Sequence, residues 1–290
     1  MGKHAYMIIA HNNFYILEKL LKLIDDERND VFIHIDKKVV DVDLQYIKSI
    51  TKKSKTTLIE PRLNIFWGSS TQVDVELALL KNAVKGNYDY YHLISGVDLP
   101  LKSQDYIHKF FEENKGTEFI GFTNHDDVAP RVKYYRIFTN TSFYRNKLIS
   151  YVDRVNAKVQ SILGVNRLKH NNYTLRRGAQ WFSITNDLAK HILSKKEEIV
   201  KFCDKTICSD EVFMQTFTLN SKFKDKLHSI TSENNGSFRC IDWKRGNPYV
   251  FRSKDFQELV QSPYLFARKF DVNVDKEIVD KIYNYIKSNK

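Results

Sequence analysis

The sequence predicts a single α/β domain with a central sheet flanked by helices, and three observations support this prediction. Short apolar runs of strand length alternate with longer segments in which apolar residues recur every three or four positions. Polar residues directly follow several of the apolar runs, as they do where parallel strands present ligand-binding groups. The 290 residues are 42% hydrophobic, enough for one large core. We therefore expect one domain spanning residues 1–290.

The first third of the chain carries the clearest pattern. Residues 6–10 (YMIIA) predict a buried strand, and residues 14–24 predict a helix because their apolar side chains fall on one face. Residues 31–35 (VFIHI) predict a second strand. Residues 73–84 are typical of a helix, and residues 90–94 (YYHLI) predict a third strand.

The rest of the chain divides at a basic, aromatic middle segment. We expect residues 1–124 and 178–290 to form the two halves of the domain, with residues 125–177 as a basic aromatic insertion between them. The insertion has helical character over residues 152–163. Its tyrosines, arginines and lysines fit a solvated insertion as well as they fit an acceptor-binding surface, and the pattern does not separate these two interpretations.

The C-terminal part begins with a predicted strand over residues 178–184 (GAQWFSI), which is followed by a helix over 187–193. No internal repeat or low-complexity linker interrupts it.

The chain is strongly basic, with a net charge of +11 and a pI of about 9.3. This charge indicates an anionic partner, and nucleic acid, a phospholipid surface and a nucleotide diphosphate all satisfy that description. The sequence has no helix-turn-helix, zinc-finger or RNP-type aromatic signature, so we do not expect nucleic acid to be the partner.

Cysteine usage and the N-terminus bear on location. The three cysteines lack CxxC spacing, which favours neither a zinc site nor a disulfide framework. The apolar run over residues 5–10 is too short for a signal peptide or a membrane span. The expected location is the cytoplasm, with peripheral contact at the inner face of the membrane, because a basic surface suits anionic lipid.

Six short motifs occur in an order and spacing that together are specific. They are HIDKK at 34–38, WG at 67–68, SGVDLPLK at 95–102, GAQWF at 178–182, SDE at 209–211 and LFARKFD at 265–271. With these motifs the chain resembles the core-2/I-branching β-1,6-N-acetylglucosaminyltransferase family, which includes the peptide O-xylosyltransferases. The resemblance implies a glycosyltransferase A type fold, inversion at the anomeric carbon and no divalent metal. It also implies that residues 1–124 are the nucleotide-binding half and residues 178–290 the acceptor-binding and catalytic half. The chain lacks the anchor, stem and cysteines of the animal enzymes, so a soluble, bacterial-type member is expected.

Glu211 is the candidate catalytic base. It follows a polar turn and precedes a helical pattern that begins at Val212, so we expect it in the first turn of a helix. Family members carry the catalytic glutamate at the matching place, and one positioned carboxylate can take the proton of an acceptor hydroxyl. The alternative is that Asp210 and Glu211 only complement the helix dipole, a contribution of about 0.3 to 1 kcal/mol.

No metal site is expected. Asp41 and Asp43 precede an apolar helical pattern and are typical of an N-cap and first turn. The loop after the strand at 90–94, where a metal motif would fall, has the single carboxylate Asp98, which is too few ligands for a divalent ion. By resemblance, Asp98 contacts the donor sugar.

Cations would then stabilise the departing diphosphate. The resemblance assigns this role to Arg252 and Lys269, with Lys254 and Arg268 as competitors. A solvated surface position is the commoner role for any one of the 46 Lys and Arg residues.

The remaining site residues come from the resemblance. Ala10, His11 and Asp36 would contact the uridine, and Trp243 would pack on the acceptor. Trp67 and Trp181 are expected in the core.

The predicted function is therefore metal-independent, inverting transfer of a sugar from a UDP-sugar to a glycan hydroxyl. N-acetylglucosamine is the first donor sugar expected. The expected acceptor is either a polysaccharide repeat, which can be attached to a lipid carrier, or a glycoprotein glycan. No cofactor beyond the UDP-sugar is expected. The alternatives are a non-catalytic relative that binds UDP-sugar or carbohydrate, and a basic nucleic-acid-binding protein.

Overall fold

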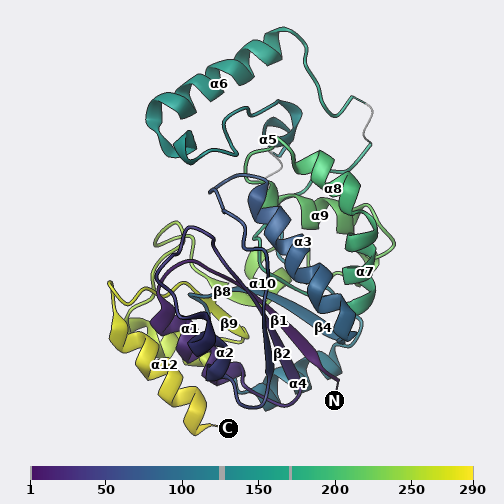
Figure 1. Ribbon diagram of the computed structural model, residues 1–290. Coiled ribbons are helices and arrows are strands. Elements are labelled where there is room, and N and C mark those ends of the chain that lie inside the picture. Colours follow the sequence, from purple (N-terminus) through teal and green to yellow (C-terminus); the bar gives the residue numbers. More distant parts are fainter. Residues whose placement is uncertain (1, 124–127, 170–171, 290) are drawn as a thin grey trace.

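The computed structural model describes residues 2–123, 128–169 and 172–289. Its centre is a six-stranded mixed sheet with the strand order β3-β2-β1-β4-β7-β6, and a three-stranded sheet with the order β5-β9-β8 lies beside it (Figure 1). The first four strands of the large sheet are parallel, and β7 and β6 are antiparallel to their neighbours. The predicted α/β class with a central mixed sheet is confirmed.

The strands are short outside the centre of the large sheet. Their bounds are β1 His4–Ala10, β2 Asn29–Ile35, β3 Lys55–Leu58, β4 Tyr90–Ser95, β5 Leu99–Pro100, β6 Phe119–Ile120, β7 Phe182–Thr185, β8 Arg239–Ile241 and β9 Phe266–Arg268.

The described residues form twelve α-helices. They are α1 Phe14–Ile24, α2 Leu44–Ile50, α3 Thr71–Ala83, α4 Gln104–Glu113, α5 Ala129–Lys133, α6 Lys147–Ile162, α7 Asn186–Ser194, α8 Lys196–Cys203, α9 Phe213–Leu219, α10 Glu233–Ser237, α11 Phe256–Gln261 and α12 Lys276–Ser288.

Two apolar layers hold the helices against the large sheet. Side chains alternate across β1, so that Met7 packs in one layer and Ile8 in the other. The layer of Met7 includes α3, α7, α8 and α9, and that of Ile8 includes α1, α2, α4 and α12. Figure 1 shows the same division, with α3 and α7 on one side and α1 and α12 on the other. Both faces of the parallel strands are therefore covered, which explains why these strands are continuous apolar runs in the sequence.

Most of the predicted elements are confirmed, with the strands at 6–10, 31–35 and 90–94 inside β1, β2 and β4. The predicted strand at 178–184 is wrong in its first half, because β7 begins at Phe182. The backbone N–H of Gly178 donates to the carbonyl of Glu211 at 2.9 Å, and the Gln180 amide donates to Glu76 at 2.9 Å. Residues 178–180 therefore hydrogen bond to α3 and to the turn before α9, and not to a neighbouring strand.

The insertion projects beyond the two layers. It contains α5 and the long α6, which lies apart from the sheet at the top of Figure 1. The helix predicted at 152–163 is confirmed and begins five residues earlier, at Lys147. The expected N-terminal border at residue 125 lies outside the described residues, and the division into three parts stays a prediction.

The close approach at Gly178 generates a stability prediction. A Cβ atom added at Gly178 would lie 1.9 Å from the carbonyl oxygen of Gly121, a backbone atom that cannot move away independently. We expect Gly178→Ala to lower the free energy of unfolding by about 3 kcal/mol or more. Urea denaturation measures this.

Gly164→Ala is the matched control. Nothing lies within 4 Å of its added Cβ, and its cost comes from the positive φ of 69° alone, about 1 to 2 kcal/mol. Equal losses in the two variants would contradict the close approach.

Candidate active site

Two adjoining cavities open at the carboxyl edge of the large sheet. We call the first, about 610 Å³ in volume and lined by His11, Asp36 and Arg268 among others, the sheet-edge cavity. The second, about 1170 Å³ and lined by Arg177, Glu233 and Tyr264 among others, is the loop-side cavity. Within the described chain four residues line both cavities, and they are Ala179, Glu211, Trp243 and Asn247. Of these four, Glu211 is the one with an ionisable side chain.

The parallel pairing of β1 with β2 forms the floor of the sheet-edge cavity. The Asp36 backbone N–H donates to the carbonyl of Ala10 at 2.9 Å, so the residues that follow the two strands meet at one edge. The carboxylate of Asp36 accepts the backbone N–H of Lys38 at 3.0 Å and pairs with its ammonium at 3.3 Å. Of the three residues expected at the uridine, His11 and Asp36 line the cavity. Ala10 directly precedes His11 in the chain and does not line the cavity.

His11 faces a cationic environment. Burial lowers its pKa, and the charges of Arg268, Lys38 and Lys269 lower it further against the opposing effect of Asp36. The imidazole is therefore neutral at pH 7 and can act there as a hydrogen-bonding group.

A glycine brings β4 close to β1 at the same edge. The Gly96 N–H donates to the carbonyl of Ile9 at 2.9 Å, and a Cβ at Gly96 would lie 3.0 Å from the Cβ of Ala10. This approach lets the chain turn after β4 toward β5, and Asp98 lies between these two strands.

Asp98 does not line either cavity. Its side chain is buried, and its two oxygens accept the backbone N–H of Ser95 at 2.8 Å and the guanidinium of Arg268 at 2.8 Å. Burial raises the pKa of Asp98, and Arg268 opposes that shift. The guanidinium also stacks on Trp181 at 4.3 Å from the ring centroid, and it lines the sheet-edge cavity. The residue that lines the cavity is thus Arg268, and its ion pair with the buried Asp98 fixes the position of its guanidinium.

The two cations assigned by resemblance lie in neighbouring segments. The backbone N–H of Phe251 donates to the carbonyl of Lys269 at 3.0 Å, which brings the segment of Arg252 beside that of Lys269. Lys269 is half-buried and near enough to His11 to lower its pKa. Arg252 is exposed, and neither side chain is among those that line the two cavities.

Glu211 lies at the junction of the two cavities. The expectation that it sits in the first turn of a helix is wrong, because it ends the short 3₁₀ turn Ser209–Glu211 and α9 begins at Phe213. Its Oε2 atom accepts from the guanidinium of Arg131 at 2.7 Å. This ion pair orients the carboxylate and leaves Oε1 to contact a substrate.

A buried acidic pair lies behind Glu211. Burial, reinforced by the charge of Glu211, raises the pKa of Asp210 to about 7. Burial, with the charge of Asp210 as a second cause, raises the pKa of Glu76 well above its ordinary value. The amide of Gln72 donates to Asp210 at 3.0 Å, and that of Gln180 donates to Glu76. Asp210 is therefore a buried group that binds a proton near neutral pH.

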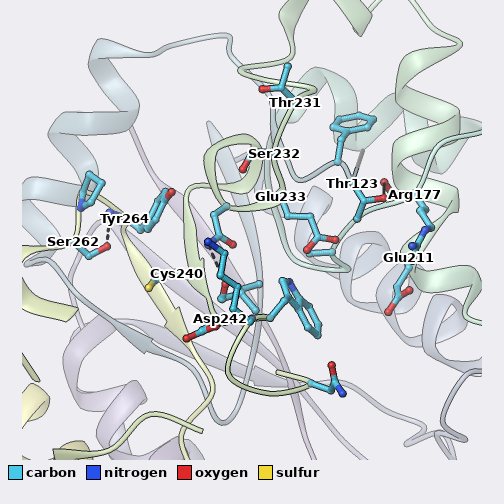
Figure 2. Close-up of a pocket in the computed structure, with 18 of the residues that line it drawn as sticks. Thr123, Arg177, Glu211, Thr231, Ser232, Glu233, Cys240, Asp242, Ser262 and Tyr264 are labelled. Atoms are coloured by element: carbon cyan, nitrogen blue, oxygen red, sulfur yellow. Dashed lines mark hydrogen bonds between the residues drawn. The ribbon is translucent and has the colours of Figure 1, made fainter. Parts of the chain in front are cut away.

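The loop-side cavity has walls of different character (Figure 2). Figure 2 shows Glu211 and Arg177 on one side and Tyr264 on the opposite side, with Glu233 between them. Trp243 is 45% exposed and lines this cavity together with Glu233 and Arg177. An exposed indole face beside a carboxylate and an arginine is suited to packing on a sugar ring.

Several cavity residues were not anticipated from the sequence. Trp67 was expected in the core, but it is 62% exposed and lines the sheet-edge cavity, whereas Trp181 is buried as expected. Arg131, Arg177 and Glu233 reach the loop-side cavity from separate parts of the chain. Arg131 belongs to the basic segment noted in the sequence, and neither Arg177 nor Glu233 has a local signal that distinguishes it.

The described residues contain no group of three or more His, Cys, Asp or Glu that could hold a metal ion. Asp43 is the N-cap of α2, as predicted, because its carboxylate accepts the Tyr46 N–H at 2.8 Å. Among all the residues that the structure describes, every helix is too short or too polar to span a membrane.

The chain matches a known family along most of its length. The sequence model of the Core-2/I-Branching enzyme family matches residues 4–260. The chain therefore belongs to this family, and the family predicted from the six motifs is confirmed.

Its curated relatives include xylosyltransferases. Xylosyltransferase 2 of Rattus norvegicus is 22% identical over 299 residues, which cover 95% of this chain and 33% of the relative. Xylosyltransferase 1 of Homo sapiens is 21% identical over 308 residues, which cover 98% of this chain and 30% of the relative. The chain thus spans about a third of the length of these relatives. A solved structure of mouse xyloside xylosyltransferase 1 aligns over 91% of this chain and 97% of its own at 9% identity, with a TM-score of 0.33, too low to support an argument.

The elevated pKa of Asp210 generates a prediction about pH. The folded chain keeps a proton on Asp210 up to a pH of about 7, whereas the unfolded chain loses it near the ordinary value of 3.8. Asp210 therefore lowers the free energy of unfolding progressively as the pH rises between these values. We expect Asp210→Asn to remove this loss, so that the variant gains stability relative to the wild type as the pH rises.

Urea unfolding at about pH 5 and about pH 8 tests this difference. Asp225→Asn, at an exposed position, is the control and should follow the wild type at both values. An Asp210→Asn variant with the wild-type pH dependence would show that Asp210 is not protonated in the folded chain.

Proposed function

We propose that this chain transfers a sugar from a UDP-sugar to a hydroxyl group of a glycan, with inversion at the anomeric carbon and without a divalent metal. One observation carries the proposal: Glu211 is the single ionisable residue at the junction of the two cavities in the described chain. A donor in the sheet-edge cavity and an acceptor in the loop-side cavity would both meet this carboxylate. Membership of the Core-2/I-Branching enzyme family supports the same assignment.

The donor nucleotide would bind at the carboxyl ends of β1 and β2. There Ala10, His11 and Asp36 would contact the uridine, and the neutral imidazole and the buried carboxylate can both accept hydrogen bonds. Parallel sheets generally bind nucleotides at this edge. Arg268 lines the cavity near the expected diphosphate, with Lys269 beside His11.

In the reaction, one carboxylate suffices. The acceptor hydroxyl gives its proton to Oε1 of Glu211 while its oxygen forms a bond to the anomeric carbon. On the opposite side of that carbon, the bond to the diphosphate oxygen breaks, and UDP leaves with the bonding electrons. The Arg131 ion pair keeps Glu211 directed toward the junction throughout.

The leaving group becomes more negative as this bond breaks. Arg268 is held in place by Asp98 and Trp181, so it can stabilise this charge without rearranging. Lys269 adds a second charge from an adjacent position, and Arg252 is the third candidate. Asp98 then acts by positioning Arg268, rather than by touching the donor sugar.

The acceptor would pack on Trp243 in the loop-side cavity. Its chemical class is a glycan, in a polysaccharide repeat or on a glycoprotein. N-acetylglucosamine is the first donor sugar to test because of the motifs shared with the branching enzymes, and xylose is the second because the relatives at 21–22% identity are named xylosyltransferases.

Donor hydrolysis tests the role of Glu211 without a known acceptor. We expect UDP release from one UDP-sugar of a panel to persist in EDTA and to fall at least about 100-fold in Glu211→Gln, because the amide cannot take a proton. UDP affinity, measured by calorimetry, should stay within about threefold of the wild type because the base does not hold the nucleotide. Glu112→Gln, at an exposed position on α4, is the matched control.

Three outcomes would contradict parts of this proposal. Loss of activity in EDTA would require a metal. Full activity in Glu211→Gln would remove Glu211 as the base. UDP binding without turnover of any donor, even with a panel of glycan acceptors, would favour a non-catalytic relative.

A second prediction concerns the buried ion pair. Arg268→Gln should weaken UDP binding by about tenfold or more, through loss of a charge on the diphosphate. Asp98→Asn should weaken it in the same direction because Arg268 loses its fixed position, and the double variant should lose little more than Arg268→Gln alone. Calorimetric titration with UDP measures all three. Additive losses would show that Asp98 acts independently of Arg268.

A further inference from the structure

Helix α6, Lys147–Ile162, packs through its polar face on the segment that follows α5. Its buried side chains are Asp153, Ala157 and Gln160. Asp153 is fully buried and pairs with Arg136 at 3.0 Å. Gln160 accepts the backbone N–H of Tyr135 at 2.8 Å and donates to the Tyr135 carbonyl at 2.9 Å. These polar contacts set the rotation of the helix about its axis.

The opposite face of α6 is apolar and exposed. Its apolar side chains recur at helical spacing and are between 44% and 77% exposed, at Leu148, Tyr151, Val152, Val155, Val159 and Ile162. At 100° per residue these positions form one stripe of roughly 100°. A surface helix normally buries its apolar stripe and exposes its polar face. In α6 the polar face is buried and the apolar stripe is exposed. A contiguous apolar stripe of this kind on a soluble chain marks an interaction surface.

Basic residues border one side of the stripe. Lys147, Arg154 and Lys158 are exposed and lie within about 40° of one another around the helix. The only acidic residue of α6 is Asp153, which is buried and paired with Arg136. Residues 128–169 contain nine Lys or Arg residues and that one carboxylate. The stripe therefore lies in a strongly positive field.

We propose that α6 docks this chain onto an anionic lipid bilayer, with the apolar stripe between the headgroups and the basic border on lipid phosphates. An amphipathic helix with an apolar face and a Lys/Arg border binds at the membrane interface in this way. A second copy of the chain is a poorer partner, because pairing two α6 stripes would bring two strongly basic segments together.

The docking surface is connected to the proposed site. The segment between α5 and α6 contributes Thr141 and Tyr144 to the wall of the sheet-edge cavity. Docking through α6 would therefore hold this wall close to the lipid surface. The docking itself does not depend on the proposed sugar transfer, and it can be measured without donor or acceptor.

Vesicle flotation of the whole chain tests the proposal. Wild type should float with vesicles of phosphatidylcholine and phosphatidylglycerol, and binding should weaken strongly with phosphatidylcholine alone or at high salt. The double variant Val155→Asp/Val159→Asp should bind anionic vesicles at least about tenfold more weakly. Arg154→Gln and Lys158→Gln should each weaken binding by about fivefold.

Val200→Asp is the matched control, since Val200 is an exposed valine on α8. It should float like wild type, and near-ultraviolet circular dichroism should show that every variant folds. Equal flotation of the Val155→Asp/Val159→Asp and Val200→Asp variants would overturn the proposal, as would binding that ignores lipid charge. A dimer in sedimentation velocity that Val155→Asp/Val159→Asp dissociates would assign the stripe to a second copy instead.

Discussion

The ion pair between Asp98 and Arg268 joins the two sheets at the proposed donor site. Asp98 lies between β4 of the large sheet and β5 of the small one, and Arg268 ends β9 of the small sheet. A buried carboxylate without a partner would cost several kcal/mol, so Arg268 and the Ser95 N–H are required to offset its burial. The same pair fixes a guanidinium at the cavity wall. One contact thus neutralises Asp98, and in the proposed reaction it would also place the cation that the leaving group needs.

The cavities lie beside this pair because of the chain topology. The parallel strands β1, β2 and β4 end at one edge, and the glycine after β4 allows the chain to pass close to β1. The turn before α9 then brings Glu211 to the junction from the other half of the sequence. In the proposed reaction, donor and acceptor would approach this carboxylate from separate cavities. That separation would suit a direct displacement, in which the two bonds lie on opposite sides of the anomeric carbon.

Part of this arrangement could be predicted from sequence. The central strands are buried on both faces, so they are continuous apolar runs, and α1 and α3 have clear helical spacing. His11 and Asp36 could be placed together because the ends of adjacent parallel strands meet at one edge. The N-cap at Asp43 also has a local cause, which is a carboxylate before an apolar helical run.

The rest depends on contacts between distant segments, which leave no local pattern. The strands β8 and β9 have three residues each, too few for a periodicity, and Arg268 meets Asp98 across 170 positions of the chain. Gly178 to Trp181 resemble a strand in composition, yet their hydrogen bonds go to the helical layer. Trp67 was expected inside because tryptophan is mostly buried, and its exposure reflects the cavity that it lines.

The configuration of the released sugar tests the account most directly. If Glu211 is the one base at the junction, water replaces the acceptor on the side opposite the diphosphate, and an α-linked UDP-sugar must first yield the β-sugar. Proton NMR of the anomeric signals, recorded before mutarotation, distinguishes the two anomers. The account predicts that the β-anomer forms first. First formation of the α-anomer would show retention, and it would contradict direct displacement with Glu211 as the base.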